Sequence, residues 1–254
     1  MITYSIPFGA SLLNQYNVCI MSETTTETIV MSVGGSLIVP DQIDTNFLKA
    51  LHIFITTQTT DHGRRFIIIA AGGRTARRYQ DAAATVSDLA SEDLDWMGIH
   101  ATRLNGHLLR TIFRDIAHYE MITNPDTILD VPATAQLIIA AGYRPGASTD
   151  LRAVQIAERV GAQKVINLSN TDYVYTDNPT TNSEAEKIED ISWNEFRKLI
   201  PDAWDPGLSS PFDPVAAREA ERLGLEVASI NGTDLSQLTK YLNSEAFVGT
   251  RIHK

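Results

Sequence analysis

The sequence predicts an α/β fold, a three-layer α/β/α sandwich with a largely parallel central sheet. Short apolar runs that are typical of buried strands recur along the chain, and segments with helical periodicity lie between them. This alternation favours a parallel sheet that is covered by helices on both faces. Four of the apolar runs end in glycines or small polar residues, at Gly34, Gly72, Gly142 and Ser169. Because ligands in such folds bind at the carboxyl ends of the strands, we expect these four turns to form one binding site.

The composition narrows the classes of partner. The chain has 254 residues and a formal net charge of -10. We therefore expect neither nucleic acid nor a membrane as a main partner, although a few arginines and local N–H groups can still hold a nucleotide. The single cysteine, Cys19, excludes an intrachain disulfide and a cysteine-rich zinc site. It also fits a reducing cytoplasm, which is the predicted location.

Two segments are expected along the chain. Residues 1–28 are predicted to be an N-terminal extension that can be disordered, as exposed chain ends often are, and Met21 is an alternative start. The extension lacks the basic region of a signal peptide. No apolar run in the sequence approaches the ~20 residues that span a bilayer. Residues 29–254 are predicted to be one domain.

The first predicted strand, residues 29–33, ends in a turn that contains Gly34, Gly35 and Ser36. Glycines in such a turn let the backbone approach a phosphate closely. Taken alone, this pattern is more often an ordinary turn. A helix is predicted to follow over residues 45–57.

The second predicted strand, residues 65–71, ends in Gly72 and Gly73, and a helix that begins with several arginines follows it. The planar guanidinium groups match phosphate oxygens in a bidentate way. Arg77 is the strongest functional candidate, and Arg74 is a weaker one. The alternative is a solvated basic face, to which we assign Arg78 first.

A helix is predicted over residues 93–109, with Asp95 near its start. A carboxylate there is stabilised by the helix dipole, so a role as a simple helix cap is the alternative to a functional one. His100 has no second histidine at metal-binding spacing, so we predict no zinc site. A further helix is expected over residues 110–119, and residues 129–134 are expected to continue the helical layer.

The third predicted strand, residues 136–140, is followed by a turn rich in glycine and hydroxyl groups that leads to a helical pattern over residues 153–160. Aligned N–H groups and the positive end of the helix dipole make such a turn a ready anion site. Asp150 lies at its end.

The last third of the chain repeats the alternation. A strand over residues 164–168 leads to a polar and aromatic loop, residues 169–179, which suits an adenine and ribose and is otherwise a hydrophilic loop. Asp213 is predicted to cap a helix whose first residue is Pro214. The remaining predictions are an amphipathic segment at 191–200, a strand at 225–230, a helix at 234–242 and an edge strand at 249–252.

These motifs together resemble the uridylate (UMP) kinases of the amino-acid-kinase superfamily, most closely the archaeal-type branch. The resemblance covers residues 29–254 in order, and each motif is weak alone but the ordered set is strong. The block from residue 95 to 105 separates UMP kinases from kinases of small carboxylates and of isoprenoid phosphates. The motifs are Gly34-Gly35-Ser36, Gly72-Gly73-Arg74 with Arg77, residues 95–105, Pro145 to Asp150, Asn170 to Thr176, and Asp213 to Ala217.

The resemblance implies an enzyme of pyrimidine nucleotide synthesis that transfers the γ-phosphoryl group of ATP to UMP, giving UDP and ADP. It also implies an amino-acid-kinase fold with an acceptor-side lobe at about 29–165 and an ATP-side lobe at about 166–254. The cofactor would be Mg²⁺ with ATP, held mainly by the phosphates and not by a metal site on the protein. Self-association as a homo-oligomer, a dimer or a homohexamer, is a further expectation.

The resemblance also assigns roles to individual residues. The implied ATP ligands are Gly35, Ser36, Gly73, Arg77, Ser169, Asn170, Tyr175 and Asn178. The implied UMP ligands are Gly72, Asp95, Thr102, Tyr143, Arg144, Pro145, Gly146, Ala147, Ser148 and Thr149. The implied catalytic residues are Asp150, Arg77, Arg74 and Arg144.

The chemistry of the implied reaction needs no general base. The attacking oxygen belongs to a phosphate whose second pKa is ~6, so it is already ionised near neutral pH. Catalysis must then come from alignment and from neutralising the charge of the transferred group. Asp150 is therefore expected to orient glycine-loop N–H groups or the waters of Mg²⁺, with helix capping as the alternative.

The chain departs from the pattern at four positions, of which Ser32, Asn167 and Tyr173 come first. Ser32 and Asn167 stand where bacterial relatives carry lysines, and the archaeal-type branch carries aspartate at the first of these positions. Tyr173 stands where a glycine is usual, and a left-handed backbone there would cost on the order of 1 kcal/mol.

Arg144 stands where archaeal relatives often have histidine. We hypothesise that Arg144, with Arg74 and Arg77, supplies the positive charge of the absent lysines. Two other functions stay open from the sequence alone. One is a non-catalytic module that binds or stores a nucleotide or another anion, and the other is a kinase for a different small phosphate or carboxylate.

Overall fold

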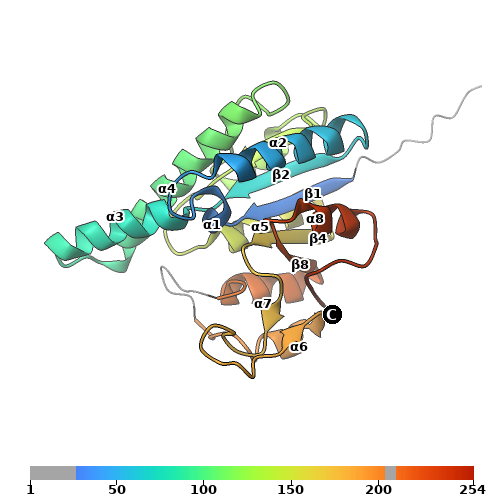
Figure 1. The fold of residues 1–254 in the computed structure, drawn as a ribbon. Helices are drawn as coiled ribbons and strands as arrows, with labels where there is room; N and C mark the ends of the chain where they lie inside the picture. Colours follow the sequence, from blue (N-terminus) through green and yellow to red (C-terminus); the bar gives the residue numbers. More distant parts are fainter. Residues whose placement is uncertain (1–26, 204–209) are drawn as a thin grey trace, which may run out of the picture.

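A seven-stranded sheet forms the centre of the computed structural model (Figure 1), which describes residues 27–203 and 210–254. The strand order is β3-β2-β1-β4-β8-β9-β7, and every neighbouring pair is parallel except β8 with β9. The predicted largely parallel sheet is therefore confirmed. The strands are β1 (Thr28–Val33), β2 (Arg65–Ala70), β3 (Leu137–Ala140), β4 (Lys164–Ser169), β7 (Asp190–Ser192), β8 (Glu226–Asn231) and β9 (Thr250–His253).

Helices cover both faces of the sheet, as the apolar character of its central strands predicts. Alternate residues of one strand face opposite layers, so Val30 packs in the core beneath α5 and α7 while Met31 packs beneath α2 and α8. The three-layer sandwich is thus confirmed. The longer helices are α2 (Thr45–Thr60), α3 (Gly73–Val86), α4 (Ser91–Ile112), α5 (Thr149–Val160), α7 (Pro214–Leu223) and α8 (Leu235–Leu242).

Short elements complete the described chain. A single helical turn, α1 (Gly35–Ile38), follows β1 where a tight glycine turn was predicted, and η1 (Pro125–Asp130) is a short 3-10 helix. The polar loop after β4 contains a two-stranded antiparallel sheet of β5 (Val174–Tyr175) and β6 (Lys187–Ile188). The segment predicted to be amphipathic contains β7 and the short helix α6 (Trp193–Phe196).

The last strand does not lie at the edge of the sheet, so that prediction was wrong. β9 lies between β8, to which it is antiparallel, and β7, to which it is parallel, with Ile252 in register with Val227 and Ile191. The edge is instead formed by the three residues of β7. A strand's place in a sheet depends on partners far away in sequence, which its own pattern does not encode.

The predicted second helix over residues 110–119 is also absent. α4 continues to Ile112, and Phe113 then turns into the core, where its side chain is 1% exposed. The chain beyond it runs along the outer edge of β3, where the N–H groups of His118 and Ile122 donate to the carbonyls of Leu137 and Ile139. Pairing with this edge replaces the helical hydrogen bonds.

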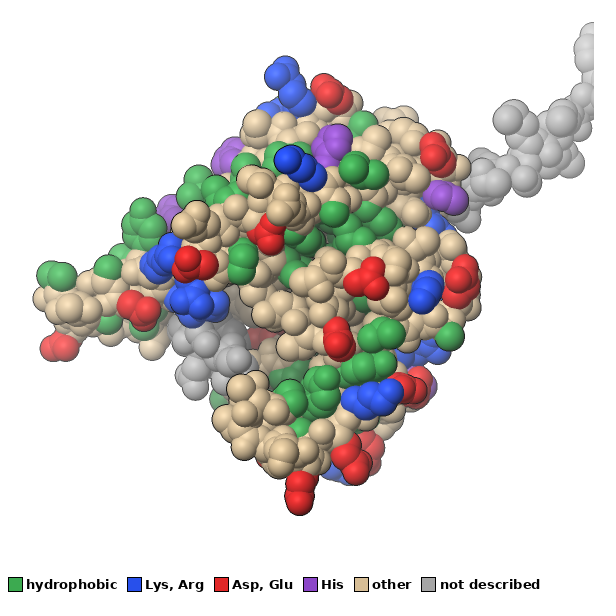
Figure 2. Space-filling view, viewed as in Figure 1, with side chains coloured by type: hydrophobic (Ala, Val, Ile, Leu, Met, Phe, Trp, Pro, Cys, Tyr) green, Lys and Arg blue, Asp and Glu red, His purple; other side chains and the backbone are tan. Residues whose placement is uncertain are grey.

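The structure bears on the predicted N-terminal extension and on the two predicted lobes. Residues 1–26 of the predicted extension lie outside the described residues, and Thr28 already begins β1. β1 pairs with β4, so the two predicted lobes share one sheet. In the described part of the chain, no helix combines the length and apolarity that crossing a membrane requires. Acidic and basic side chains are interspersed on the face shown in Figure 2.

Candidate active site

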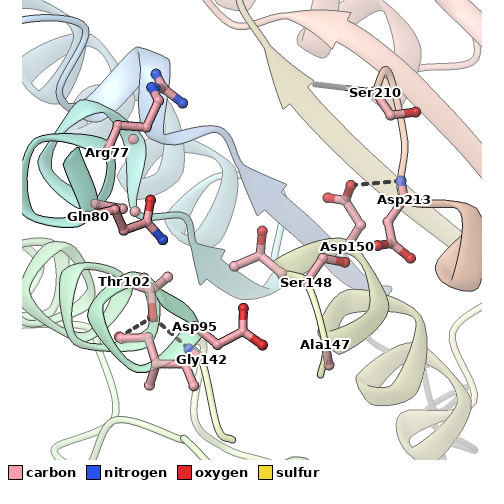
Figure 3. Close-up of a pocket in the computed structure, with 16 residues that line it drawn as sticks. Arg77, Gln80, Asp95, Thr102, Gly142, Ala147, Ser148, Asp150, Ser210 and Asp213 are labelled. Atoms are coloured by element: carbon pink, nitrogen blue, oxygen red, sulfur yellow. Dashed lines mark hydrogen bonds between the residues drawn. The ribbon is translucent and has the colours of Figure 1, made fainter. Parts of the chain in front are cut away.

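A cavity of about 260 Å³ opens at the carboxyl ends of the central strands (Figure 3). Its walls come from the turn after β2 and the start of α3, from α4, from the turn after β3 and the start of α5, and from the segment before α7. β2 and β3 are neighbours in the sheet, which brings the first and third walls together. The lining residues are Gly72, Gly73, Ala76, Arg77, Gln80, Asp95, Gly98, Ile99, Thr102, Gly142, Ala147, Ser148, Thr149, Asp150, Ser210 and Asp213.

The two glycine turns at the strand ends touch through their backbones. A Cβ on Gly35 would lie 2.0 Å from the nitrogen of Gly73, and a Cβ on Gly73 would lie 2.3 Å from the oxygen of Gly35. Gly73 also has a φ of +62°, which side chains rarely adopt. Buried Asn105 supports the second turn, since its amide donates to the carbonyl of Ala71 at 2.8 Å. The turns predicted to hold phosphate therefore meet at one point.

Asp95 faces the cavity from the second turn of α4, which begins at Ser91. It does not cap the helix, so the capping alternative was wrong. Its Oδ2 atom accepts a hydrogen bond of 2.8 Å from the N–H of Gly146 in the turn after β3. One carboxylate oxygen thus holds the turn, while the second is available to a ligand.

Thr102 fixes the end of β3 against α4. Its buried hydroxyl donates to the carbonyl of Ile99 at 2.7 Å and accepts from the N–H of Gly142 at 2.8 Å. A Cβ on Gly142 would lie 2.8 Å from this hydroxyl, so the close approach requires glycine. Both hydrogen-bonding functions of the hydroxyl are used inside the protein.

Asp150 joins three parts of the fold. Ser148 is the residue that caps α5, and the capping alternative for Asp150 was wrong. The Asp150 carboxylate instead accepts a hydrogen bond from the hydroxyl of Ser32 on β1 and another from the N–H of Asp213, both at 3.2 Å. Burial raises the pKa of Asp150 to about 6, and the negative charge of Asp213 adds to this rise.

Asp213 is 5% exposed and caps α7, as predicted, with Pro214 at the first helical position. Its Oδ1 atom accepts from the N–H of Ala216 at 2.6 Å, whereas its Oδ2 atom is buried without a hydrogen-bond partner. Burial also raises the pKa of this carboxyl group. A buried carboxylate oxygen without a partner carries a desolvation cost that a cation would remove.

The charges of the cavity fit a magnesium complex of a polyphosphate. Among the lining residues that the structure describes, Arg77 is the basic one, and it lies across the cavity from Asp150 and Asp213 (Figure 3). Three lining residues are acidic, namely those two aspartates and Asp95. Phosphates entering such a site need a further cation, and carboxylate oxygens are the ligands that Mg²⁺ and its waters prefer.

Two of the predicted arginines lie outside the cavity lining. The half-exposed side chain of Arg74 donates to the carbonyl of Pro40 at 2.8 Å. Arg144 is exposed, and its guanidinium lies 5.5 Å from the centre of the Tyr143 ring. Of the three arginines expected to replace the family lysines, Arg77 is the one that the fold brings to the cavity.

The predicted acceptor loop lies partly inside and partly outside the cavity lining. Ala147, Ser148 and Thr149 line the cavity, while Gly146 contacts it through Asp95. The side chains of Tyr143 and Pro145 are not part of the lining. The loop therefore presents its second half to the cavity.

The predicted ATP-side residues occupy two places. Ser36 and Asn170 line a separate hollow of about 440 Å³ between α1, α2 and the ends of β4 and β8. Ser169 ends β4, and its hydroxyl lies 3.1 Å from that of Thr171. Tyr175 on β5 and Asn178 just after it lie outside both hollows.

The departures from the family pattern have structural partners. The hydroxyl of Ser32 bonds to Asp150, and the amide of Asn167 donates to the carbonyl of Pro211 at 2.8 Å, so both replaced positions support the Asp150–Asp213 pair. Tyr173 carries no left-handed strain, because Ser244 is the one non-glycine residue of the described chain with a positive φ.

Sequence reasoning gave no ligand role to Gln80, Ser210 or Asp213, although all three line the cavity. Gln80 lies on α3 one turn after Arg77 and donates to the carbonyl of Leu94 at 2.8 Å. Asp213 was recognised only as a helix cap. Its place in the quoted motif of residues 213–217 was the signal that could have marked it.

Residues 27–228 match the model of the amino acid kinase family. The chain is 30% identical over 219 residues to a uridylate kinase of Hyperthermus butylicus, covering 85% of this chain and 94% of that protein. It is 33% identical over 227 residues to a uridylate kinase of Methanospirillum hungatei, covering 89% and 94%. The crystal structure of uridylate kinase from Archaeoglobus fulgidus superposes with a TM-score of 0.75 at 24% identity, covering 89% of this chain and all of that one.

Proposed function

The chain belongs to the amino acid kinase family, and from that premise we propose that it is a uridylate kinase, which transfers the γ-phosphoryl group of ATP to UMP and yields UDP and ADP. The relatives that carry this name match most of the chain at about 30% identity. The observation that carries the proposal is the cavity itself. It unites the Gly72-Gly73 turn, Asp95 and the start of α5, which are the parts that an acceptor nucleotide and a donor phosphate would share.

The proposed acceptor site lies between α4 and the turn after β3. The free oxygen of the Asp95 carboxylate is placed to accept from ribose hydroxyls, because its other oxygen is held by Gly146. Ser148 and Thr149 begin α5, where N–H groups and the helix dipole favour a phosphate. A nucleoside monophosphate would thus be held at both its sugar and its phosphate.

The proposed donor site lies on the side of the glycine turns. The backbones of Gly35 and Gly73 lie against each other, and Gly73 and Arg77 line the cavity at the start of α3. The hollow lined by Ser36 and Asn170 adjoins this point through α1 and offers space for the rest of ATP. The γ-phosphoryl group would then cross from the glycine turns to the acceptor at the start of α5.

Magnesium supplies charge neutralisation for the phosphates when it enters with ATP. Asp150 and Asp213 are the residues that fit it, since the Oδ2 atom of Asp213 is buried without a partner and the pKa values of both carboxyl groups are raised. No residue is needed as a base, because the acceptor phosphate is ionised. The protein contributes to the reaction by aligning the two substrates and by stabilising the charge of the transferred group.

Self-association is part of the proposal. An apolar hollow of about 610 Å³ lies between α2 and α4, with Ile53 66% exposed and Ile43 53% exposed beside it. An exposed apolar patch of this kind suits an interface, and a two-fold contact would cover it with the same patch of a second copy. Light scattering should give a dimer or larger for the native protein and a smaller species for Ile53→Asp. Equal masses for the two would contradict this contact.

The reaction uses ATP and UMP, so we also propose that the protein works in the cytoplasm. The test of the activity is a coupled assay with ATP, Mg²⁺ and a panel that contains UMP, CMP, AMP and GMP. Formation of UDP in proportion to enzyme supports the proposal. Nucleotide binding without turnover would favour a storage module, and turnover of another small phosphate or a carboxylate alone would favour a different kinase of this family.

A further inference from the structure

Three successive carbonyl groups at the start of the acceptor loop, those of residues 142, 143 and 144, each accept a hydrogen bond from an arginine of a neighbouring helix. On α4, Arg103 donates from Nε to the carbonyl of Gly142 at 3.1 Å and from Nη2 to that of Tyr143 at 2.8 Å. On α5, Arg152 donates from Nη2 to the carbonyl of Arg144 at 3.3 Å. Neither arginine lines the cavity.

Arg152 is an unusual residue for the buried face of a helix. It is 5% exposed, and it faces no carboxylate among the hydrogen-bond partners that the structure gives it. Its Nη1 atom donates to Gln155 at 2.7 Å, and its Nε atom is buried without a partner. A buried charge in this state costs stability, and an apolar side chain of similar volume would often be better tolerated.

The ring of Tyr143 links this arginine to the loop. The guanidinium of Arg152 lies 5.5 Å from the ring centre, within the range of a cation–π contact. The loop is held at its other end by the bond from Gly146 to Asp95 and by Ser148, which caps α5. Between these points the backbone is fixed by arginines rather than by sheet or helix hydrogen bonds.

We propose that Arg103 and Arg152 are positioning residues that hold the acceptor loop, residues 142–149, in the form that binds the acceptor nucleotide. The stability that Arg152 costs is then explained by a gain in binding, because a pre-ordered loop loses less conformational freedom when the acceptor binds. The donor side of the site contains neither contact. Their loss should therefore weaken acceptor binding and leave donor binding unchanged. This inference rests on the proposed function.

The test compares Arg152→Met with Arg159→Met in the full-length protein. Both changes remove an arginine from α5, but Arg159 bonds to Asp126 and not to the loop. For Arg152→Met we expect the KM for UMP to rise about tenfold, which corresponds to about 1.4 kcal/mol, with the KM for ATP changed less than twofold and the melting temperature unchanged or higher. For Arg159→Met we expect both KM values to stay within twofold.

Two further measurements keep the test decisive. The N–H groups of Gly142 and Gly146 donate to Thr102 and Asp95, and their hydrogen exchange should speed up in Arg152→Met and in Arg103→Met but not in Arg159→Met, whether or not UMP turns over. If Arg152→Met does not fold, Arg152→Lys replaces it, with the same expected direction. The proposal is overturned if the KM for UMP stays within twofold, if the KM for ATP rises equally, or if loop exchange is unchanged. A native protein without UMP turnover would contradict the proposed function instead.

Discussion

Asp150 and Asp213 are two acidic residues of the cavity lining whose carboxyl groups have raised pKa values. They are joined through the backbone of Asp213, which is 5% exposed, and Arg77 is the basic residue of the described cavity lining. Burial raises the pKa of each. Such groups favour a cation and lower the stability of the empty protein.

Asp150→Asn should change how stability depends on pH. The pKa of Asp150 is raised from 3.8 to about 6, so in the native protein the proton is retained after the unfolded chain has lost it. Its contribution to the free energy of unfolding is full below about pH 4 and is lost as pH rises through about 6. Relative to the native protein, the Asn variant should therefore gain on the order of 2 to 3 kcal/mol between pH 4 and pH 7.

Chemical denaturation without nucleotide at several pH values between 4 and 7 measures this difference. Adding ATP with Mg²⁺ at pH 7 should stabilise the native protein more than the variant. A stability difference that does not change with pH would show that the carboxyl group is not desolvated as the structure has it.

At the scale of elements, the site depends on glycine turns that connect β1 to α1 and β2 to α3. The backbones of Gly35 and Gly73 meet so closely that no side chain fits on either. This contact sets the distance between the two turns, and Asn105 on α4 supports it from beneath. This contact helps to position α3 and its Arg77, together with the hydrogen bond from Gln80 to Leu94 of α4; no residue of α3 is buried, and the helix projects from the body of the protein (Figure 1).

Gly35→Ala should disrupt this junction. The new Cβ would lie 2.0 Å from a backbone nitrogen, which cannot move as a flexible side chain could. We expect a loss of about 1 to 3 kcal/mol in the free energy of unfolding, as overpacking typically costs, and a rise in the KM for ATP.

Gly63→Ala is the matched control for this change. Its Cβ would meet nothing within 4 Å, so the cost is limited to a backbone with a φ of +64°, roughly 1 kcal/mol. It lies far from the cavity lining, and its KM for ATP should be unchanged. Equal KM values for the two variants would contradict the role given to the junction.

The elements themselves were predictable where the signal is local. The buried strands β1, β2 and β4 are rich in apolar residues, with Ser32 and Asn167 as polar interruptions, and Asp213 with Pro214 marks the start of α7. The end of α4 was missed because it depends on the burial of Phe113 and on pairing with β3. The start of α5 was placed four residues late, because Thr149 begins a helix whose cap, Ser148, lies inside the glycine-rich turn.

At the scale of the whole molecule, the order of the strands brings the site together. β2 and β3 are neighbours, so turns that are about 70 residues apart in sequence line one cavity. β9, the last strand of the chain, lies in the sheet between β8 and β7. The end of the chain is therefore part of the core rather than an edge.

Ile252→Ala should reveal this place in the sheet. The side chain is fully buried and lies between Val227 of β8 and Ile191 of β7. Removing it should lower the free energy of unfolding by about 2 to 5 kcal/mol. Val248→Ala, at a site that is 36% exposed, should lower it by less than about 1 kcal/mol. If urea denaturation gives the two variants similar losses in the free energy of unfolding, β9 is not an interior strand.

The candidate site was predictable in its glycine turns and in some of its side chains. The sequence identified the glycine turns, Asp95 and Arg77, because strand ends in a parallel sheet must meet at one edge. It ranked Arg77 above Arg74, but it could not show that the Arg74 side chain bonds to the carbonyl of Pro40 instead of lining the cavity. Nor could it find Arg152, whose function depends on the backbone of a loop rather than on a motif.

The measurement that tests the central claim most directly is a ³¹P NMR time course of ATP, UMP and Mg²⁺ with the native protein and with Arg77→Ala. The native protein should form UDP and ADP in equal amounts at the expense of both substrates. Arg77→Ala should slow this by at least about 100-fold, since it removes the basic side chain that lines the described cavity. The account is contradicted if the native protein binds both nucleotides and forms no UDP, or if the variant turns over at the native rate.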